Sequence, residues 1–170
     1  ALLYIKTGIN YELKKDLNIV KNKLLESILI EVINECEKNI IVGCVYKHPP
    51  MLPNEFTDDY LSPLIEKISL AKKQAIILGD FNMDLMKFDQ NNDISNFLQT
   101  ITSNFLFPFI TLPTRITTHS KTLIDNIFLN FYTPDIISGN LTISISDHVA
   151  QFILIPSLPE QKKVNKYCKR

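Results

Sequence analysis

Short apolar runs of strand length are the feature that most limits what this chain can fold into. The runs NIIVGCVY (39–46), AIILG (75–79) and VAQFILI (149–155) are rich in aliphatic and β-branched residues. They indicate buried strands, whereas a membrane helix needs about 20 apolar residues. A chain of 170 residues with 45% hydrophobic content can bury one substantial core. We therefore expect a single domain built on a β-sheet, with no membrane-spanning segment.

Strands and helices are expected to interleave without a strict strand-helix-strand rhythm. The runs 24–33 and 39–46, joined by a polar turn, indicate an antiparallel pair, and three more strands are expected within 122–130, 139–146 and 149–155. Helical spacing of apolar residues predicts one helix with Ser62 as its cap and Pro63 in its first turn, and another that starts at Asp93 as its cap. This order favours an α/β (α+β) fold with a mixed sheet covered by helices.

The two ends of the chain differ from its body. Ala1–Ile9 lacks an initiator Met and is predicted to be a strand already in progress, so the N-terminal part of the domain is expected to be missing. Residues 161–170 hold five Lys or Arg and no acid, which leaves 13 basic against 18 acidic groups in the rest. A mildly acidic body argues against a protein that coats phosphates with lysines, but it suits an enzyme that uses carboxylates and a divalent cation. Three cysteines without a C-x-x-C pair suit a reducing compartment.

Polar side chains interrupt the strand pattern at several points. Asp80 and Asn82 end one face of the strand that starts at Ala75. Asp125 lies in the apolar row of another strand, where an unpaired carboxylate would cost several kcal/mol, so it needs a partner. Asp147 and His148 stand together directly before the last strand.

Each of these signals also has a structural explanation. Asp-x-Asn after a strand is common turn chemistry, Asp-His can be a surface loop, and an Asp in a strand can pair with a nearby Lys. Tyr46, at the end of its strand, can be an aromatic at the rim of the core. Their joint occurrence at strand ends or on strand faces favours one functional site, because catalytic groups often gather there.

Four segments in this order carry a family resemblance: VYKHPP (45–50), ILGDFNMDL (77–85), PTRITTHSKTLIDNIF (113–128) and ISDHVAQF (145–152). The set resembles the endonuclease/exonuclease/phosphatase (DNase I-like) superfamily, and within it the endonuclease domain of jockey-like non-LTR retrotransposons. The resemblance implies a four-layered α/β sandwich of two mixed sheets flanked by helices, over residues 1–156, with 157–170 as a basic tail or linker. It also implies an intracellular protein, nuclear at its point of action, that nicks target DNA and is followed by a reverse transcriptase domain.

The resemblance also assigns roles. Asp80 resembles the group that orients or deprotonates the attacking water, and Asn82 the residue beside it that holds phosphate or nucleophile. His148 resembles the residue that stabilises charge on the scissile phosphate, with Asp125 as its hydrogen-bonded carboxylate. Tyr46 is expected to contact the phosphate or leaving group, and Asp147 to bind a metal. Mg²⁺ or Mn²⁺ fits these oxygen ligands better than zinc. Arg115, Lys47 and His48 are candidate contacts to the DNA backbone.

One departure leaves alternatives open. Members of the family carry upstream strands that bear an Asn and a metal-binding Glu, and no residue here can be assigned to them. Glu26, Glu31 and Glu35 are expected to be solvated instead. The chain is then either an active nuclease domain, a catalytically dead remnant of one, or another branch of the superfamily that acts on phosphoinositide, lipid or RNA phosphoesters.

Overall fold

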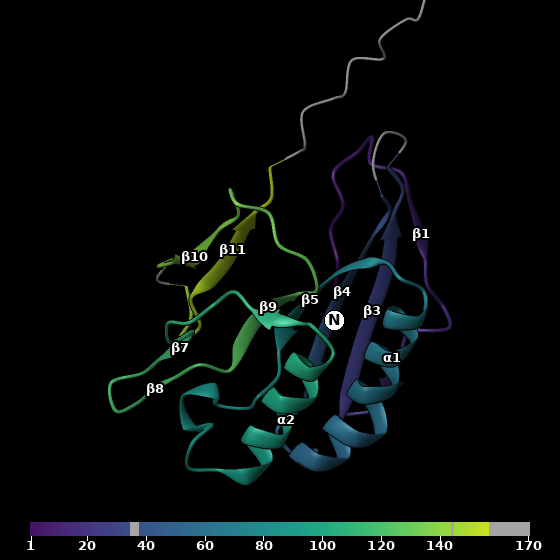
Figure 1. Cartoon of the computed structure of the whole chain (residues 1–170). Helices are drawn as coiled ribbons and strands as arrows, with labels where there is room; N and C mark the ends of the chain where they lie inside the picture. Colours follow the sequence, from purple (N-terminus) through teal and green to yellow (C-terminus); the bar gives the residue numbers. More distant parts are fainter. Residues whose placement is uncertain (35–37, 144, 157–170) are drawn as a thin grey trace, which may run out of the picture.

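The main sheet has seven strands and organises the structure, a computed structural model that describes residues 1–34, 38–143 and 145–156 (Figure 1). Its order is β1-β3-β4-β5-β9-β6, with β2 paired to β3. Only β4 and β5 are parallel; every other pair is antiparallel, so the sheet is mixed as expected. The strands are β1 (Tyr11–Leu13), β2 (Val20–Lys21), β3 (Leu25–Val32), β4 (Ile40–Lys47), β5 (Gln74–Asp80), β6 (Phe107–Pro108) and β9 (Asp125–Leu129).

Two helices cover one face of this sheet (Figure 1). They are α1 (Ser62–Leu70), which continues the π-helical segment η1 (Glu55–Leu61), and α2 (Asn92–Ser103), which follows the short 3₁₀ helix η2 (Leu85–Lys87). Each helix buries one apolar stripe, because its hydrophobic residues recur at helical spacing. The core beneath them holds a cluster of aromatic rings with centroids 5.2–6.2 Å apart, made of Phe56, Phe81, Phe97 and Phe128.

Two small antiparallel sheets complete the described fold. One pairs β7 (Arg115–Ile116) with β8 (Lys121–Thr122), and the other pairs β10 (Ile137–Leu141) with β11 (Ala150–Leu154). The β10–β11 hairpin lies against β9, and Ile153 packs on the main core. The α/β fold is thus confirmed, and in the described part of the chain the expected second sheet is represented by this hairpin.

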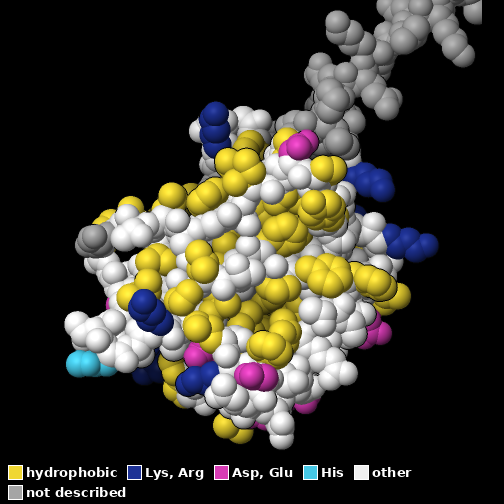
Figure 2. Space-filling model, turned by 60° about the vertical axis from the view of Figure 1, so that its left-hand side comes forward, with side chains coloured by type: hydrophobic (Ala, Val, Ile, Leu, Met, Phe, Trp, Pro, Cys, Tyr) yellow, Lys and Arg dark blue, Asp and Glu magenta, His cyan; other side chains and the backbone are white. Residues whose placement is uncertain are grey.

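The main-sheet face that points away from the helices is only partly covered. Its side chains on β4 and β5, among them Val42, Cys44, Ile76 and Leu78, remain half-exposed, whereas their neighbours on the helix side are buried. A space-filling view shows a broad area of hydrophobic side chains on one side of the molecule (Figure 2). No helix in the described residues is long and apolar enough to cross a membrane.

Several local predictions were wrong by a few residues or more. The predicted strand at Ala1–Ile9 is absent, and the first strand is β1. Ser62 does not cap α1, because the chain is already helical from Glu55. The cap of α2 is Asn91, whose side chain accepts hydrogen bonds from the backbone N–H groups of Asp93 and Ile94. Asp93, the predicted cap, lies inside the helix.

Glu31 is also a correction, because it is buried rather than solvated. It is 3% exposed, and its carboxylate accepts hydrogen bonds from Lys14, Lys73 and Asn39. Glu26 is closer to expectation, with 35% of its side chain exposed. Glu35 and the basic tail at 157–170 lie outside the described residues.

Candidate active site

The end of β5 presents Asp80 at a point where two backbones come unusually close. The residue before it, Gly79, has a φ of +149°, and a Cβ atom there would lie 1.8 Å from the carbonyl oxygen of Val45 on β4. Only glycine fits this position. The strand register then sets Asp80 opposite Tyr46 on one side and opposite Asp125 on the other.

Asp80, Asp125 and His148 meet at this end of the main sheet. One ligand atom from each of the three side chains lies within 4.8 Å of the others. His148 Nδ1 is 3.0 Å from Asp125 Oδ2 and 3.3 Å from Oδ1, so the imidazole supplies the partner that Asp125 was expected to need. Because Nδ1–H donates to this carboxylate, Nε2 is the ring nitrogen left for another group.

The net effect of the surroundings of Asp80 is a carboxyl pKa above the ordinary value for an aspartate. Burial raises the pKa of its carboxyl, and the nearby Asp125 carboxylate raises it further. The backbone N–H of Asn82, which donates to Asp80 Oδ1 at 2.9 Å, lowers the pKa, as do the charges of His148 and Arg115. A half-buried carboxylate with a raised pKa in such a cluster is typical of a functional site.

Asn82 lies beside Asp80 in a left-handed conformation, with φ of +48°. Its side-chain amide donates to the carbonyl oxygen of Lys47 at 2.8 Å, which ties the turn after β5 to the end of β4. Lys47 itself is 1% exposed, and burial lowers the pKa of its ammonium group. An interior ammonium does not fit the predicted contact with the DNA backbone, so that prediction is corrected for Lys47.

Arg115 and Asp147 form an exposed pair next to the cluster. Arg115 Nε donates to Asp147 Oδ2 at 2.7 Å, and this contact lowers the pKa of the Asp147 carboxyl. Arg115 also bridges to His148 through the backbone. Asp147 is not among the three residues whose ligand atoms converge, so the structure places it beside the predicted metal site, paired with an arginine.

Tyr46 and His48 lie at the end of β4, with ring centroids 4.4 Å apart. Both are half-buried. His48 Nε2 is 3.3 Å from Glu26 Oε1, so the predicted DNA contact of His48 would compete with this carboxylate. His119 lies on the exposed loop between β7 and β8, away from these residues in sequence and register.

Sequence reasoning missed Thr114, whose hydrogen bonds join the segments that carry Asp125 and His148. Its hydroxyl oxygen is fully buried and accepts hydrogen bonds from the backbone N–H groups of Asp125 and Ile124 at 3.0 and 3.2 Å. The Thr114 carbonyl accepts from Val149 N–H, directly after His148. Thr114 therefore holds the Asp125 strand and the His148 segment together. Its place beside Arg115 in the PTRIT stretch was the one available signal.

The donor set fits a hard divalent cation. Two carboxylates and an imidazole within 4.8 Å can supply ligands to Mg²⁺ or Mn²⁺. Asp125 has its oxygens partly engaged by His148, so Asp80 is the member with the most free ligand capacity.

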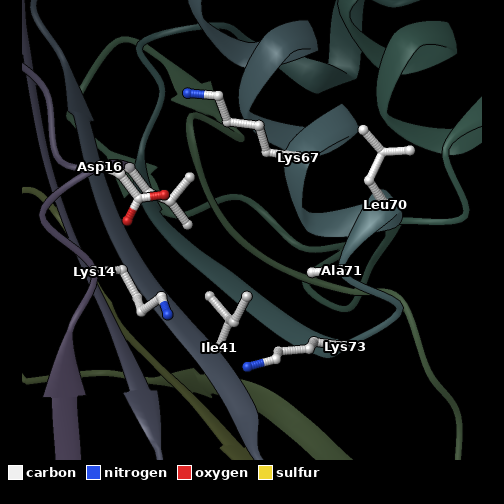
Figure 3. Close-up of a pocket in the computed structure, with 8 residues that line it drawn as sticks. Lys14, Asp16, Ile41, Lys67, Leu70, Ala71 and Lys73 are labelled. Atoms are coloured by element: carbon white, nitrogen blue, oxygen red, sulfur yellow. The ribbon is translucent and has the colours of Figure 1, made fainter.

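A separate pocket of about 390 Å³ lies at the opposite end of the main sheet (Figure 3). Lys14 and Lys73 lie on either side of Ile41 there, and both ammonium groups are bound to Glu31. Asp16 and Lys67 also line it. Because acidic groups already compensate most of its lysines, this pocket does not resemble the charged site at the other end.

Several solved structures share this fold. The structure is similar to the endonuclease domain of TRAS1, a telomere-specific non-LTR retrotransposon, with a TM-score of 0.60 at 16% identity over 86% of this chain and 66% of that one. An endonuclease/exonuclease/phosphatase family protein from Leptotrichia buccalis aligns with a TM-score of 0.57 at 17% identity, over 89% and 62%. The 3′ phosphatase NExo from Neisseria, bound to a product DNA hairpin, aligns with a TM-score of 0.53 at 12% identity, over 90% and 72%.

These likenesses define the fold class. The chain has the DNase I-like fold of the endonuclease/exonuclease/phosphatase superfamily, as its motifs predicted. No protein-family model and no curated protein matches the sequence. The chain spans slightly less than two thirds of the TRAS1 domain and of the Leptotrichia protein.

Proposed function

We propose that this chain is the DNA-cleaving part of a retroelement protein, a phosphodiester hydrolase that nicks DNA with the help of Mg²⁺ or Mn²⁺. The convergence of Asp80, Asp125 and His148 on one end of the sheet carries the proposal. The fold it shares with the TRAS1 endonuclease domain supports the retroelement origin. The proposal includes a reverse transcriptase domain downstream and action in the nucleus.

Each residue of the cluster has a role that follows from its contacts. Asp80, whose pKa is raised by burial, orients and deprotonates the water that attacks phosphorus. His148 directs Nε2 at a phosphate oxygen and stabilises the charge that develops on it. Asp125 fixes the tautomer and orientation of His148 through Nδ1. A divalent cation, when bound, neutralises charge on the phosphate oxygens and lowers the pKa of a bound water.

The flanking residues position the substrate. Asn82 is held beside Asp80 by its bond to the Lys47 carbonyl, which supports its proposed role of holding the phosphate or the nucleophile. Tyr46 stands opposite Asp80 in the register and is suited to contact the leaving group.

Arg115 forms a β-bridge with His148 and is exposed, so its guanidinium is suited to bind a DNA phosphate. Asp147 accepts a hydrogen bond from Arg115 Nε and holds the guanidinium in place.

Nicking of supercoiled plasmid tests the proposal. The assay uses the protein translated from the full reading frame that contains this chain, with Mg²⁺ or Mn²⁺ and with EDTA. We expect cation-dependent nicking, and we expect Asp80→Ala and His148→Ala each to slow it at least about a hundredfold, as for removal of a base or a charge-stabilising group.

Matched controls separate the site from general damage. Asp135→Ala and His119→Ala remove the same residue types at exposed positions outside the cluster, and both are expected to nick at the wild-type rate. Unchanged nicking by both Asp80→Ala and His148→Ala would overturn the assigned roles. Absence of nicking by the wild type, with hydrolysis of 3′-phosphate ends or of lipid and inositol phosphates, would instead place the protein in another branch of the superfamily.

A further inference from the structure

A groove of about 590 Å³ lies at the end of the main sheet opposite the catalytic cluster. Lys38, Lys72 and Lys73 line it together with Phe105 and Phe131, and among the described residues no Asp or Glu lines it. Gln74, the first residue of β5, lies in this groove, and Asp80, the last, lies in the cluster. Six strand steps separate them, which corresponds to about 20 Å.

Two residues of the groove are held there by unusual backbone conformations. Lys72 follows α1 with φ of +51°, and Phe105 follows α2 with φ of +63°. Both occupy the left-handed position that ends a helix, where glycine is the usual residue because a side chain adds strain. Leu106 N–H bonds back to Ile101 O, which completes the helix-ending motif around Phe105.

The side chain of Phe105 has no structural role that would explain its position in the groove. Lysines near helix C-termini complement the helix dipole, and Lys73 also binds the buried Glu31, so Lys72 and Lys73 each have a structural role. Neither reason applies to Phe105, and this residue is 71% exposed despite its strained backbone. A bulky residue in a left-handed conformation points to a function that the strain serves.

The combination of exposed aromatic, lysines and amide side chains matches one class of ligand. Single-stranded nucleic acid presents unstacked bases that stack on aromatic rings and phosphates that pair with lysines. Duplex DNA keeps its bases stacked inside, so an exposed phenylalanine would gain little from it. We propose that this groove binds single-stranded nucleic acid, with Phe105 as the stacking platform and with Lys38 and Lys72 as phosphate contacts, at a site distinct from the catalytic cluster.

Fluorescence anisotropy with labelled oligonucleotides tests this proposal. The full-length protein is titrated in EDTA with an oligothymidylate of about 12 nucleotides, within the size range of single-strand sites. Phe105→Gly is expected to weaken binding about tenfold or more, since stacking of one base is lost. Lys72→Gly is expected to weaken it severalfold and to reduce the slope of log K against log salt by about 0.7, as for one lost phosphate contact.

The glycine substitutions separate binding from folding. Because glycine relieves the left-handed strain, both variants are expected to melt at the wild-type temperature or above it. Lys23→Gly relieves the same strain at a position outside the groove, and Phe88→Ala removes an exposed phenylalanine elsewhere; neither is expected to change the affinity. Measurement in EDTA keeps the result independent of hydrolysis, so a failure here leaves the proposed function untouched.

Two further arms identify the ligand. An oligouridylate of the same length shows whether the strand is RNA or DNA, since both carry the same stacking and phosphate chemistry. Unchanged affinity in Phe105→Gly and Lys72→Gly would overturn the proposal. A hairpin duplex that binds more tightly than the single strand, with the same loss in Phe105→Gly, would overturn it in favour of a duplex contact.

Discussion

The two ends of the main sheet each bury a carboxylate and surround it differently. At one end Glu31, 3% exposed, accepts from Lys14, Lys73 and Asn39, and these partners lower its pKa to about 2. The charge there is compensated within the protein. A carboxylate held this firmly in its ionised form contributes to stability and has little capacity left for a ligand.

At the other end Asp125, 8% exposed, faces one imidazole and a second carboxylate. Nothing in direct contact with Asp80 is a cation in the described structure; Asp80 accepts from the Asn82 backbone, and burial raises its pKa. Two acidic groups close together in a partly buried place are costly without added positive charge. The difference teaches that burial alone does not mark a functional carboxylate: the informative one is the one whose charge the protein leaves uncompensated.

Replacement of Asp125 by Asn tests the catalytic end most severely. Asn keeps the shape of the side chain but cannot hold the His148 tautomer and imidazolium as a carboxylate does. We expect plasmid nicking to fall by a factor of about 10² to 10⁴, with little change in the free energy of unfolding. Urea unfolding beside the nicking assay checks both. If the variant unfolds easily yet nicks at the wild-type rate, Asp125 stabilises the fold and does not act in catalysis.

Glu31→Gln is the reciprocal test at the stabilising end. Loss of the charge leaves Lys14 and Lys73 without their anion, so we expect the free energy of unfolding to drop by about 2–4 kcal/mol. The rate of nicking by the folded fraction should stay at the wild-type value. A large loss of nicking at a temperature where the variant is folded would show that Glu31 affects catalysis and not only stability.

Acid unfolding sharpens the same contrast. The pKa of Glu31 is about 2 in the folded protein against 4.5 for an ordinary glutamate, so the unfolded chain binds the extra proton first. The stabilisation is complete above about pH 4.5 and is lost as the pH falls toward 2, a contribution of roughly 3 kcal/mol. Denaturant unfolding at a series of pH values measures this. The free energy of unfolding of the wild type should fall with decreasing pH between about 4.5 and 2, and that of Glu31→Gln should fall less steeply.

The sequence carried enough information to predict the main strands, and less to predict where each element begins and ends. β3, β4, β5 and β9 fall where the apolar runs placed them, because buried strands need continuous aliphatic residues. Ala1–Ile9 failed because its apolar residues find no strand partner in the described fold, and pairing is a long-range property that a local pattern cannot report. The Asn91 cap was missed because three acceptable capping residues, Asn91, Asn92 and Asp93, follow one another in the sequence.

The partners of individual side chains were likewise predictable only where a local sequence pattern implied them. The buried strand position of Asp125 implied a partner from local pattern alone, and the structure supplies His148. The partners of Glu31 lie outside its own strand, where a local pattern cannot report them, so its burial was missed. Lys47 sits at a strand end like the catalytic residues, but it shares the buried face of β4 with Ile41 and Val45, so its side chain faces inward.

Divalent cations should stabilise only the end of the main sheet that holds the Asp80 cluster. This is the smallest of the predicted effects. A cation that binds the folded cluster raises the free energy of unfolding by about 1.4 kcal/mol at ten times its dissociation constant. We expect Mn²⁺ to raise the melting temperature of wild type and of Glu31→Gln by similar amounts, and to have no effect on Asp80→Asn, because Asp80 has the freest ligand oxygens. Calorimetric scans with Mn²⁺ and with EDTA give this comparison directly. An equal upward shift in Asp80→Asn would place the cation away from the cluster, and the uncompensated charge at this end would then need a different ligand.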